Sequence, residues 1–140
     1  MTYEIVNPEA LGRPRGWNNG MLAPEGCRVL FVAGQIGVGE GPAPDLAAQF
    51  GAALANVARV VRGAGGAVAD VGRLTIYVTD MEAYRGSRAE IGAEYRSVFG
   101  KHFPAMSLVA VTELVDPRAV VEIEATAVIP QARPAPGSTV

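Results

Sequence analysis

In the last apolar segment of the chain, residues 119–128, the side chains alternate between apolar and polar from Val121 to Ala127. Alternation with a period of two is typical of a strand that is buried on one face only. One face of this predicted strand therefore belongs to the core, and the other places two carboxylates side by side. The apolar face comprises Val121, Ile123, Ala125 and Ala127, and the polar face comprises Glu122, Glu124 and Thr126.

A second β-rich segment, residues 102–111, precedes this strand, and an Asp116-Pro117 turn lies between the two. Proline fixes φ at a corner, and β-branched residues favour the extended chain on either side. The pattern predicts a hairpin, in which the two strands are direct neighbours.

Three further strands are predicted nearer the N-terminus, over residues 2–6, 27–33 and 74–79. The run 27–33 is almost continuously apolar, which indicates a strand buried on both faces, whereas 74–79 alternates. Residues 11–26 are rich in Gly, Pro and Asn and are predicted to form an irregular loop. Trp17 lies in the middle of this loop. It either covers the edge of the core or forms a wall of a ligand cleft, and the sequence leaves both readings open.

Two helices are predicted between these strands. The first begins after Asp45, a favourable N-cap residue, and ends in the glycine-rich residues 63–66. The second begins at Tyr84 and ends before Pro104, with Gly92 inside it as a weak point. The first helix carries one apolar stripe, formed by Leu46, Phe50, Leu54, Val57 and Val61.

The predicted order β-β-α-β-α-β-β favours an α+β fold, with a mixed sheet and both helices on one face. Residues 1–130 are expected to form a single domain, and the Pro/Gly-rich residues 131–140 a flexible tail. If the helices cover the apolar face of the last strand, Glu122 and Glu124 point towards solvent or a neighbouring subunit.

Composition narrows the classes of function. Of the 140 residues, 49% are hydrophobic and only 19% are charged, which is more apolar surface than a small globule readily hides and favours an oligomer. No apolar run approaches the ~18 residues of a membrane span, and no signal peptide is recognised. The single Cys27, read as a buried residue at a strand start, fits a cytoplasmic protein. A net charge of −2 with dispersed arginines argues against nucleic acid as a partner.

Side-chain chemistry alone singles out no established centre. One histidine, one distant cysteine and the glutamate pair do not make a metal site. Ser107, His102 and Asp116 supply the residue types of a catalytic triad, but no nucleophile-elbow sequence accompanies them. His102 is interpreted as a surface residue.

Several segments, in this order and spacing, resemble the RidA/YjgF family of enamine and imine deaminases. The resemblance extends from about residue 14 to residue 129. The matching segments are Gly34-Gln35-Ile36, Ala48-Gln49 with Asn56-Val57, Thr75 to Asp80, Tyr95 to Phe99, Phe103-Pro104-Ala105 and Glu122 to Val128.

The resemblance implies a chorismate-mutase-like fold and a homotrimer whose sheets face inward, with a small-molecule cleft at each subunit interface. It also implies hydrolysis of reactive enamines or imines without a metal or organic cofactor. Glu122 matches the carboxylate that orients the attacking water. Glu124 matches the family pattern and is taken as a substrate-binding candidate.

The remaining candidate residues are departures from the family pattern. Met106 replaces an arginine that binds the substrate carboxylate bidentately, and a thioether cannot form that ion pair. Leu108 replaces a cysteine, and Ala33 replaces a serine or threonine ahead of Gly34. An aromatic residue of the N-terminal loop corresponds to Trp17, and a helix asparagine to Gly92. The predicted cleft is therefore more apolar than in the arginine-bearing branch.

Three functions follow as alternatives. The chain hydrolyses small 2-imino acids, or a larger or aromatic-derived enamine, or it binds small molecules without turnover in a chaperone-like role. A structural role for Glu122, as an ion-pair partner of Arg28 or Arg73 in a trimer, also stays open. Ribonuclease activity is disfavoured because the chain is acidic and has no catalytic histidine pair.

Overall fold

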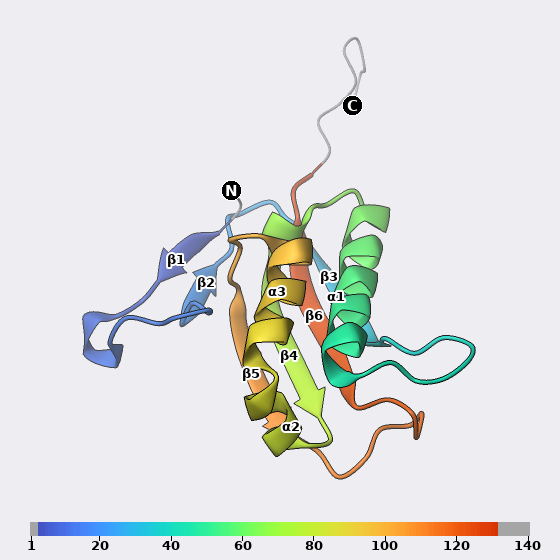
Figure 1. The fold of residues 1–140 in the computed structure, drawn as a ribbon. Helices are drawn as coiled ribbons and strands as arrows, with labels where there is room; N and C mark the ends of the chain where they lie inside the picture. The colour runs from blue at the N-terminus through green and yellow to red at the C-terminus, as the bar shows by residue number, and fades with distance from the viewer. Residues whose placement is uncertain (1–2, 132–140) are drawn as a thin grey trace.

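The computed structural model describes residues 3–131 and has the predicted α+β architecture (Figure 1). A four-stranded sheet has the order β3 (Arg28–Ile36), β6 (Val121–Ile129), β4 (Val71–Val78) and β5 (Ala105–Ala110). The long helices pack on one face of this sheet (Figure 1). Of the predicted tail, residues 132–140 lie outside the described part of the chain.

The first predicted helix is confirmed as α1 (Leu46–Gly63). The Asp45 carboxylate caps it by accepting a hydrogen bond of 2.9 Å from the Ala48 amide. From Phe50 onwards its predicted apolar stripe is buried against the sheet, while Leu46 at the first turn is half-buried. Together with the apolar face of β6, this stripe forms the centre of the core.

The second predicted helix is in fact two, α2 (Met81–Gly86) and α3 (Arg88–Phe99). The Asp80 side chain caps α2 through the Ala83 amide at 3.0 Å, so helical structure starts earlier than predicted. The helix is interrupted at Ser87, whose backbone amide donates a hydrogen bond to the carbonyl of Tyr84. In residues 3–131, no helix is long and apolar enough to cross a membrane.

The predicted hairpin of residues 102–111 and 119–128 is wrong. β4 lies between β5 and β6, pairing parallel with β5 and antiparallel with β6. The parallel pair needs a long crossover, which α2 and α3 provide. The Asp116 turn belongs instead to a loop that carries the chain past the end of β4 to the middle of the sheet.

The prediction that residues 27–33 are buried on both faces is also wrong. β3 is an edge strand covered by helices on one side only, so Val32 is buried while Val29 is 58% and Phe31 80% exposed. We call the uncovered side of the sheet the open face. By register, it carries Val29, Phe31, Arg73, Thr75, Tyr77, Ser107, Val109, Glu122, Glu124 and Thr126.

The N-terminal segment contains more regular structure than predicted. The leading strand β1 (Glu4–Val6) is confirmed, and it pairs with β2 (Gly20–Leu22), which lies inside the predicted loop. A short 3₁₀ turn, η1 (Glu9–Leu11), lies between the two strands, just before that loop. The buried Tyr3 hydroxyl anchors the segment by donating to the carbonyl of Asp70 in the 3₁₀ turn η2 (Val68–Asp70), at 2.7 Å. Cys27 is only half-buried, because it precedes an edge strand.

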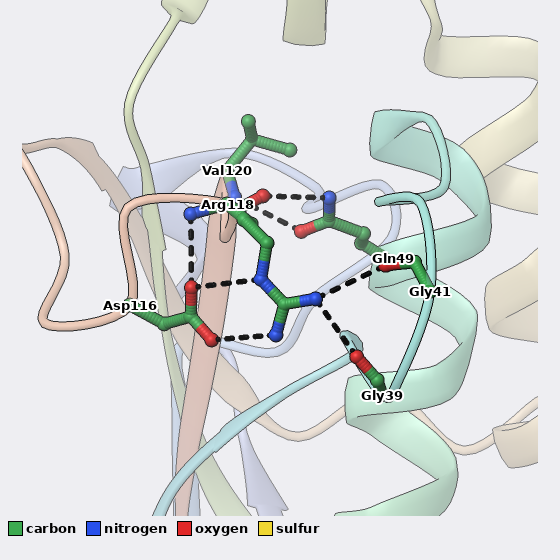
Figure 2. A network of polar contacts seen from close by, with 6 residues as sticks. All are labelled: Gly39, Gly41, Gln49, Asp116, Arg118 and Val120. Carbon is green, nitrogen blue, oxygen red and sulfur yellow. Dashed lines mark hydrogen bonds and ion pairs between the residues drawn. The ribbon is translucent and has the colours of Figure 1, made fainter.

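Two loops at the same end of the sheet are joined by a polar network (Figure 2). Arg118 pairs with Asp116 at 3.1 Å and donates to the carbonyls of Gly39 and Gly41. The buried Gln49 accepts a hydrogen bond from the Val120 amide at 2.9 Å and donates to the carbonyls of Arg118 and Pro44. The network fixes the point at which β6 begins, immediately before Glu122.

Candidate functional site

Glu122 and Glu124 lie on the open face of β6, as the alternating pattern predicts. In the register, Glu122 is opposite Tyr77 of β4, and Glu124 is opposite Thr75. Both glutamates are half-buried, whereas their neighbour Ile123 points into the core. The two carboxylates therefore share one surface, away from the helices.

The two carboxylates have different partners. The Tyr77 hydroxyl donates to Oε1 of Glu124 at 2.8 Å, and this hydrogen bond is the main cause of the raised pKa of Tyr77. The Glu122 carboxylate forms no hydrogen bond or ion pair with another of the residues 3–131, so neither Arg28 nor Arg73 pairs with it within the chain. The carboxylate of Glu122 is thus available to a water molecule or a ligand.

A β-bulge in β3 lies beside Glu122. The register with β6 shifts between Val32 and Gln35, so that the bulge, which holds Ala33 and Gly34, contains one extra residue. A Cβ at Gly34 would lie 2.5 Å from Oε2 of Glu122, so the absence of a side chain makes room for the carboxylate. Ala33 is exposed, and its carbonyl accepts a hydrogen bond from the Gln35 side chain at 3.1 Å.

Trp17, Gly92, Met106 and Leu108 are brought together in a cavity of about 500 Å³ on the helix-covered side of the sheet. Met106 and Leu108 point to this side because they pair in register with the buried Leu74 and Ile76 of β4. We call it the helix-side cavity. Its other lining residues are Arg15, Gly16, Phe50, Ile76, Tyr84, Arg88, Ile91 and Tyr95.

Trp17 lines this cavity next to core residues such as Phe50 and Ile76, and 44% of its surface is exposed. Its indole Nε1 donates to the side chain of Asn19 at 3.3 Å. The Asn18 side chain donates a hydrogen bond to the carbonyl of Phe103 at 2.6 Å, and the backbone amide of Asn18 donates one to the carbonyl of Pro104. These bonds attach the N-terminal loop to the segment that leads into β5, next to Met106.

The predicted site residues therefore form two groups. Ala33, Glu122 and Glu124 belong to the open face and its edge, and Trp17, Gly92, Met106 and Leu108 belong to the helix-side cavity. The sheet separates the two groups within one chain. Sequence reasoning did not identify Arg15, Tyr84, Arg88 and Tyr95 as cavity residues, because their common position depends on how α2 and α3 pack.

His102 is half-buried and has a structural role, where a surface position was predicted. Its Nε2 lies 2.7 Å from the carbonyl of Val71, and its own carbonyl accepts from the buried Tyr95 hydroxyl. Burial raises the pKa of Tyr95. Ser107 lies on the open face and Asp116 pairs with Arg118, so these residues form no triad. Within residues 3–131, no three His, Cys, Asp or Glu side chains are grouped as metal ligands.

Comparison with known families identifies the fold. The family model described as Endoribonuclease L-PSP matches residues 16–129, which is most of the chain. The chain belongs to the RidA/YjgF family. The match includes both groups of candidate residues.

Relatives in this family carry the names of reactive-intermediate deaminases. The 2-iminobutanoate/2-iminopropanoate deaminase of Escherichia coli K12 is 40% identical over 108 residues, covering 71% of this chain and 79% of the relative. The Rid family protein YyfB of Yersinia pestis superimposes with a TM-score of 0.77 at 33% identity, covering 91% and 98% of the two chains. TdcF of E. coli, solved with bound serine, gives a TM-score of 0.61 at 31% identity, covering 82% and 95%.

Proposed function

We propose that this protein hydrolyses a reactive enamine or imine to the corresponding carbonyl compound and ammonia, with Glu122 orienting the attacking water. The observation that carries the proposal is the unpartnered Glu122 carboxylate, for which the bulge at Gly34 makes room. The names of the curated relatives support the same class of reaction.

The reaction needs only proton transfers. An enamine first tautomerises to its imine, and the water oxygen then bonds to the C=N carbon. Glu122 takes one proton from the water and passes it to the nitrogen. As the tetrahedral intermediate collapses, the carbonyl forms, the C–N bond breaks, and the second proton of the water leaves with ammonia. No electrons are exchanged, so the step calls for no redox cofactor.

The active form in this proposal is a homotrimer. Glu122 and the helix-side cavity lie on opposite sides of one sheet, so one subunit alone does not bring them to the same substrate. A ring in which the open face of one subunit meets the cavity edge of the next would combine them. Exposed Val29, Phe31 and Val109 make the open face suited to contact with another copy.

Ammonia release tests the proposal. Imines generated in situ by an amino-acid oxidase would be supplied with and without the protein, and Glu122→Gln should lower the acceleration by about 100-fold or more. Glu113→Gln, an exposed glutamate in the loop before β6, is the matched control and should retain full activity. If no imine in the panel is hydrolysed faster than in buffer, the deaminase assignment fails.

Binding without turnover is the second candidate function. It is supported by the replacement of the family's carboxylate-binding arginine by Met106, which weakens the hold on small 2-imino acids. Under this alternative, ligands bind in the helix-side cavity, and Glu122→Gln changes neither affinity nor ammonia release.

A further inference from the structure

The helix-side cavity has an uneven distribution of charge. Arg15 and Arg88 are the only charged residues among those that line it, and no Asp or Glu is included. The chain as a whole has a net charge of −2, whereas the lining of this cavity carries two positive charges and no negative one. Such a cavity favours an anionic ligand.

Neither arginine has a structural partner. Among residues 3–131, Arg118 is held by Asp116 and two carbonyls, and Arg59 donates to Asn56. The side chains of Arg15 and Arg88 form no hydrogen bond or ion pair there, and both residues are exposed. Their guanidinium groups are therefore free to bind a ligand.

The position of Arg88 is unfavourable for the helix that contains it. Arg88 is the first residue of α3, where the positive end of the helix dipole disfavours a cation. Glu90 in the same turn forms no ion pair with it. The presence of arginine here is not explained by the stability of α3, whereas an anion bound at the cavity would account for it.

The remaining wall of the cavity is largely apolar and aromatic. Trp17, Tyr84 and Tyr95 contribute rings, and Met106 contributes a thioether. The Tyr95 hydroxyl is already bonded to the carbonyl of His102, so this residue offers mainly its ring. A volume of about 500 Å³ lies within the usual range of small-molecule sites and exceeds what a three- or four-carbon imino acid fills.

We propose that Arg88, assisted by Arg15, binds the carboxylate of a 2-imino acid whose side chain is aromatic. The assignment rests on the proposed deaminase function and specifies its substrate class. In this assignment the arginines that bind the carboxylate lie on α3 and in the N-terminal loop, and not on β5 at the position of Met106. A guanidinium fork binds a carboxylate bidentately, and the aromatic side chain packs against the rings of the cavity.

Calorimetric titration with stable 2-oxo acids tests this without any turnover. The probes are phenylpyruvate, 2-oxobutanoate and the neutral benzyl methyl ketone. Phenylpyruvate should bind the wild-type protein at least about tenfold more tightly than either other compound, and added salt should weaken its binding. Arg88→Gln and Arg15→Gln should each weaken phenylpyruvate by about tenfold while leaving benzyl methyl ketone unchanged.

Two further variants keep the result interpretable. Arg62→Gln removes an exposed arginine at the end of α1, outside the cavity, and should bind as the wild type does. Arg88→Lys keeps the charge but loses the fork, and should restore part of the affinity. Equal binding of phenylpyruvate by wild type, Arg88→Gln and Arg15→Gln would overturn the assignment, as would absence of binding to the wild type.

The test separates this assignment from the proposed function. The titration measures the binding of a stable 2-oxo acid without turnover, so its result does not depend on whether Glu122 acts as a base. If binding depends on the arginines but no imine is hydrolysed, the deaminase proposal fails and the carboxylate site stands. If ammonia is released and the arginine variants bind phenylpyruvate as the wild type does, the carboxylate site fails and the deaminase proposal stands.

Discussion

Gly34 lies against the carboxylate of Glu122, so close that a methyl group at Gly34 would be 2.5 Å from Oε2. The overlap involves the flexible end of the glutamate and not the backbone, so the fold can absorb it by moving the carboxylate. The orientation of Glu122 is thereby linked to a glycine on the neighbouring strand.

Gly34→Ala should therefore reduce activity more than stability. We expect ammonia release to fall by about tenfold or more, since a displaced base no longer holds water at the reacting carbon. The melting temperature should change little. Gly39→Ala is the matched control, because a Cβ at Gly39 meets nothing within 4 Å. Full activity in Gly34→Ala would show that the position of Glu122 does not matter for the reaction.

Phe31→Glu tests the assembly of the proposed trimer. Phe31 is 80% exposed on the open face, and a new carboxylate there would be buried without a partner if copies associate through this surface. Light scattering should give a trimer for the wild type and a smaller species for the variant, with ammonia release lost. Val115→Glu, on a fully exposed loop residue, should leave the trimer intact. A monomeric wild-type protein would contradict the shared site.

Gln49→Ala tests the polar network of Figure 2. The substitution leaves the Val120 amide and the Pro44 and Arg118 carbonyls without their side-chain partner, at a site that is almost fully buried. The free energy of unfolding should fall by about 1–3 kcal/mol. Arg118→Ala removes an exposed ion pair and two hydrogen bonds to exposed carbonyls, which water can replace, and should cost less than Gln49→Ala. Denaturant titration of both variants measures the difference, and equal losses would refute this ranking.

Tyr3→Phe tests the anchor of the N-terminal segment through its pH dependence. Burial is the main cause that raises the pKa of Tyr3 to about 12 from an ordinary value of 10.0. The unfolded chain therefore loses the phenolic proton first, and the stabilisation, complete below pH 10, is lost as the pH rises towards 12. The wild-type melting temperature should fall more steeply than that of the variant in this window. If the melting temperatures of the two proteins fall in parallel with pH, the pKa of Tyr3 does not change on folding.

Local patterns predicted the elements whose determinants are local. The stripe from Phe50 to Val61 and the cap at Asp45 suffice to define α1, and the alternation around Glu122 suffices to assign the faces of β6. The predicted hairpin failed because strand pairing is a long-range property, and nothing near Asp116 encodes the presence of β4 between β5 and β6.

The sequence did not predict how the candidate site residues are arranged in the fold. Glu122 and Met106 were read as residues of adjoining strands, whereas they lie on opposite faces of the sheet, with β4 between their strands. The arginines of the cavity carry no sequence signal of their own, because Arg15 and Arg88 are separated by more than 70 positions and meet only through tertiary packing. Only the structure shows that the side chains of these arginines lack an ion-pair partner among residues 3–131.

The order of strands also dictates when, during synthesis, this sheet is completed. β6 joins β3 to the β4–β5 pair, yet it is the last of these strands to leave the ribosome. Until then, the facing edges of β3 and β4 both expose unpaired backbone groups, which invite pairing with other nascent chains. When β6, the strand that carries Glu122, pairs with β3 and β4, it covers these exposed edges. Mutations that slow this pairing would first appear as a lower yield of the protein in cells.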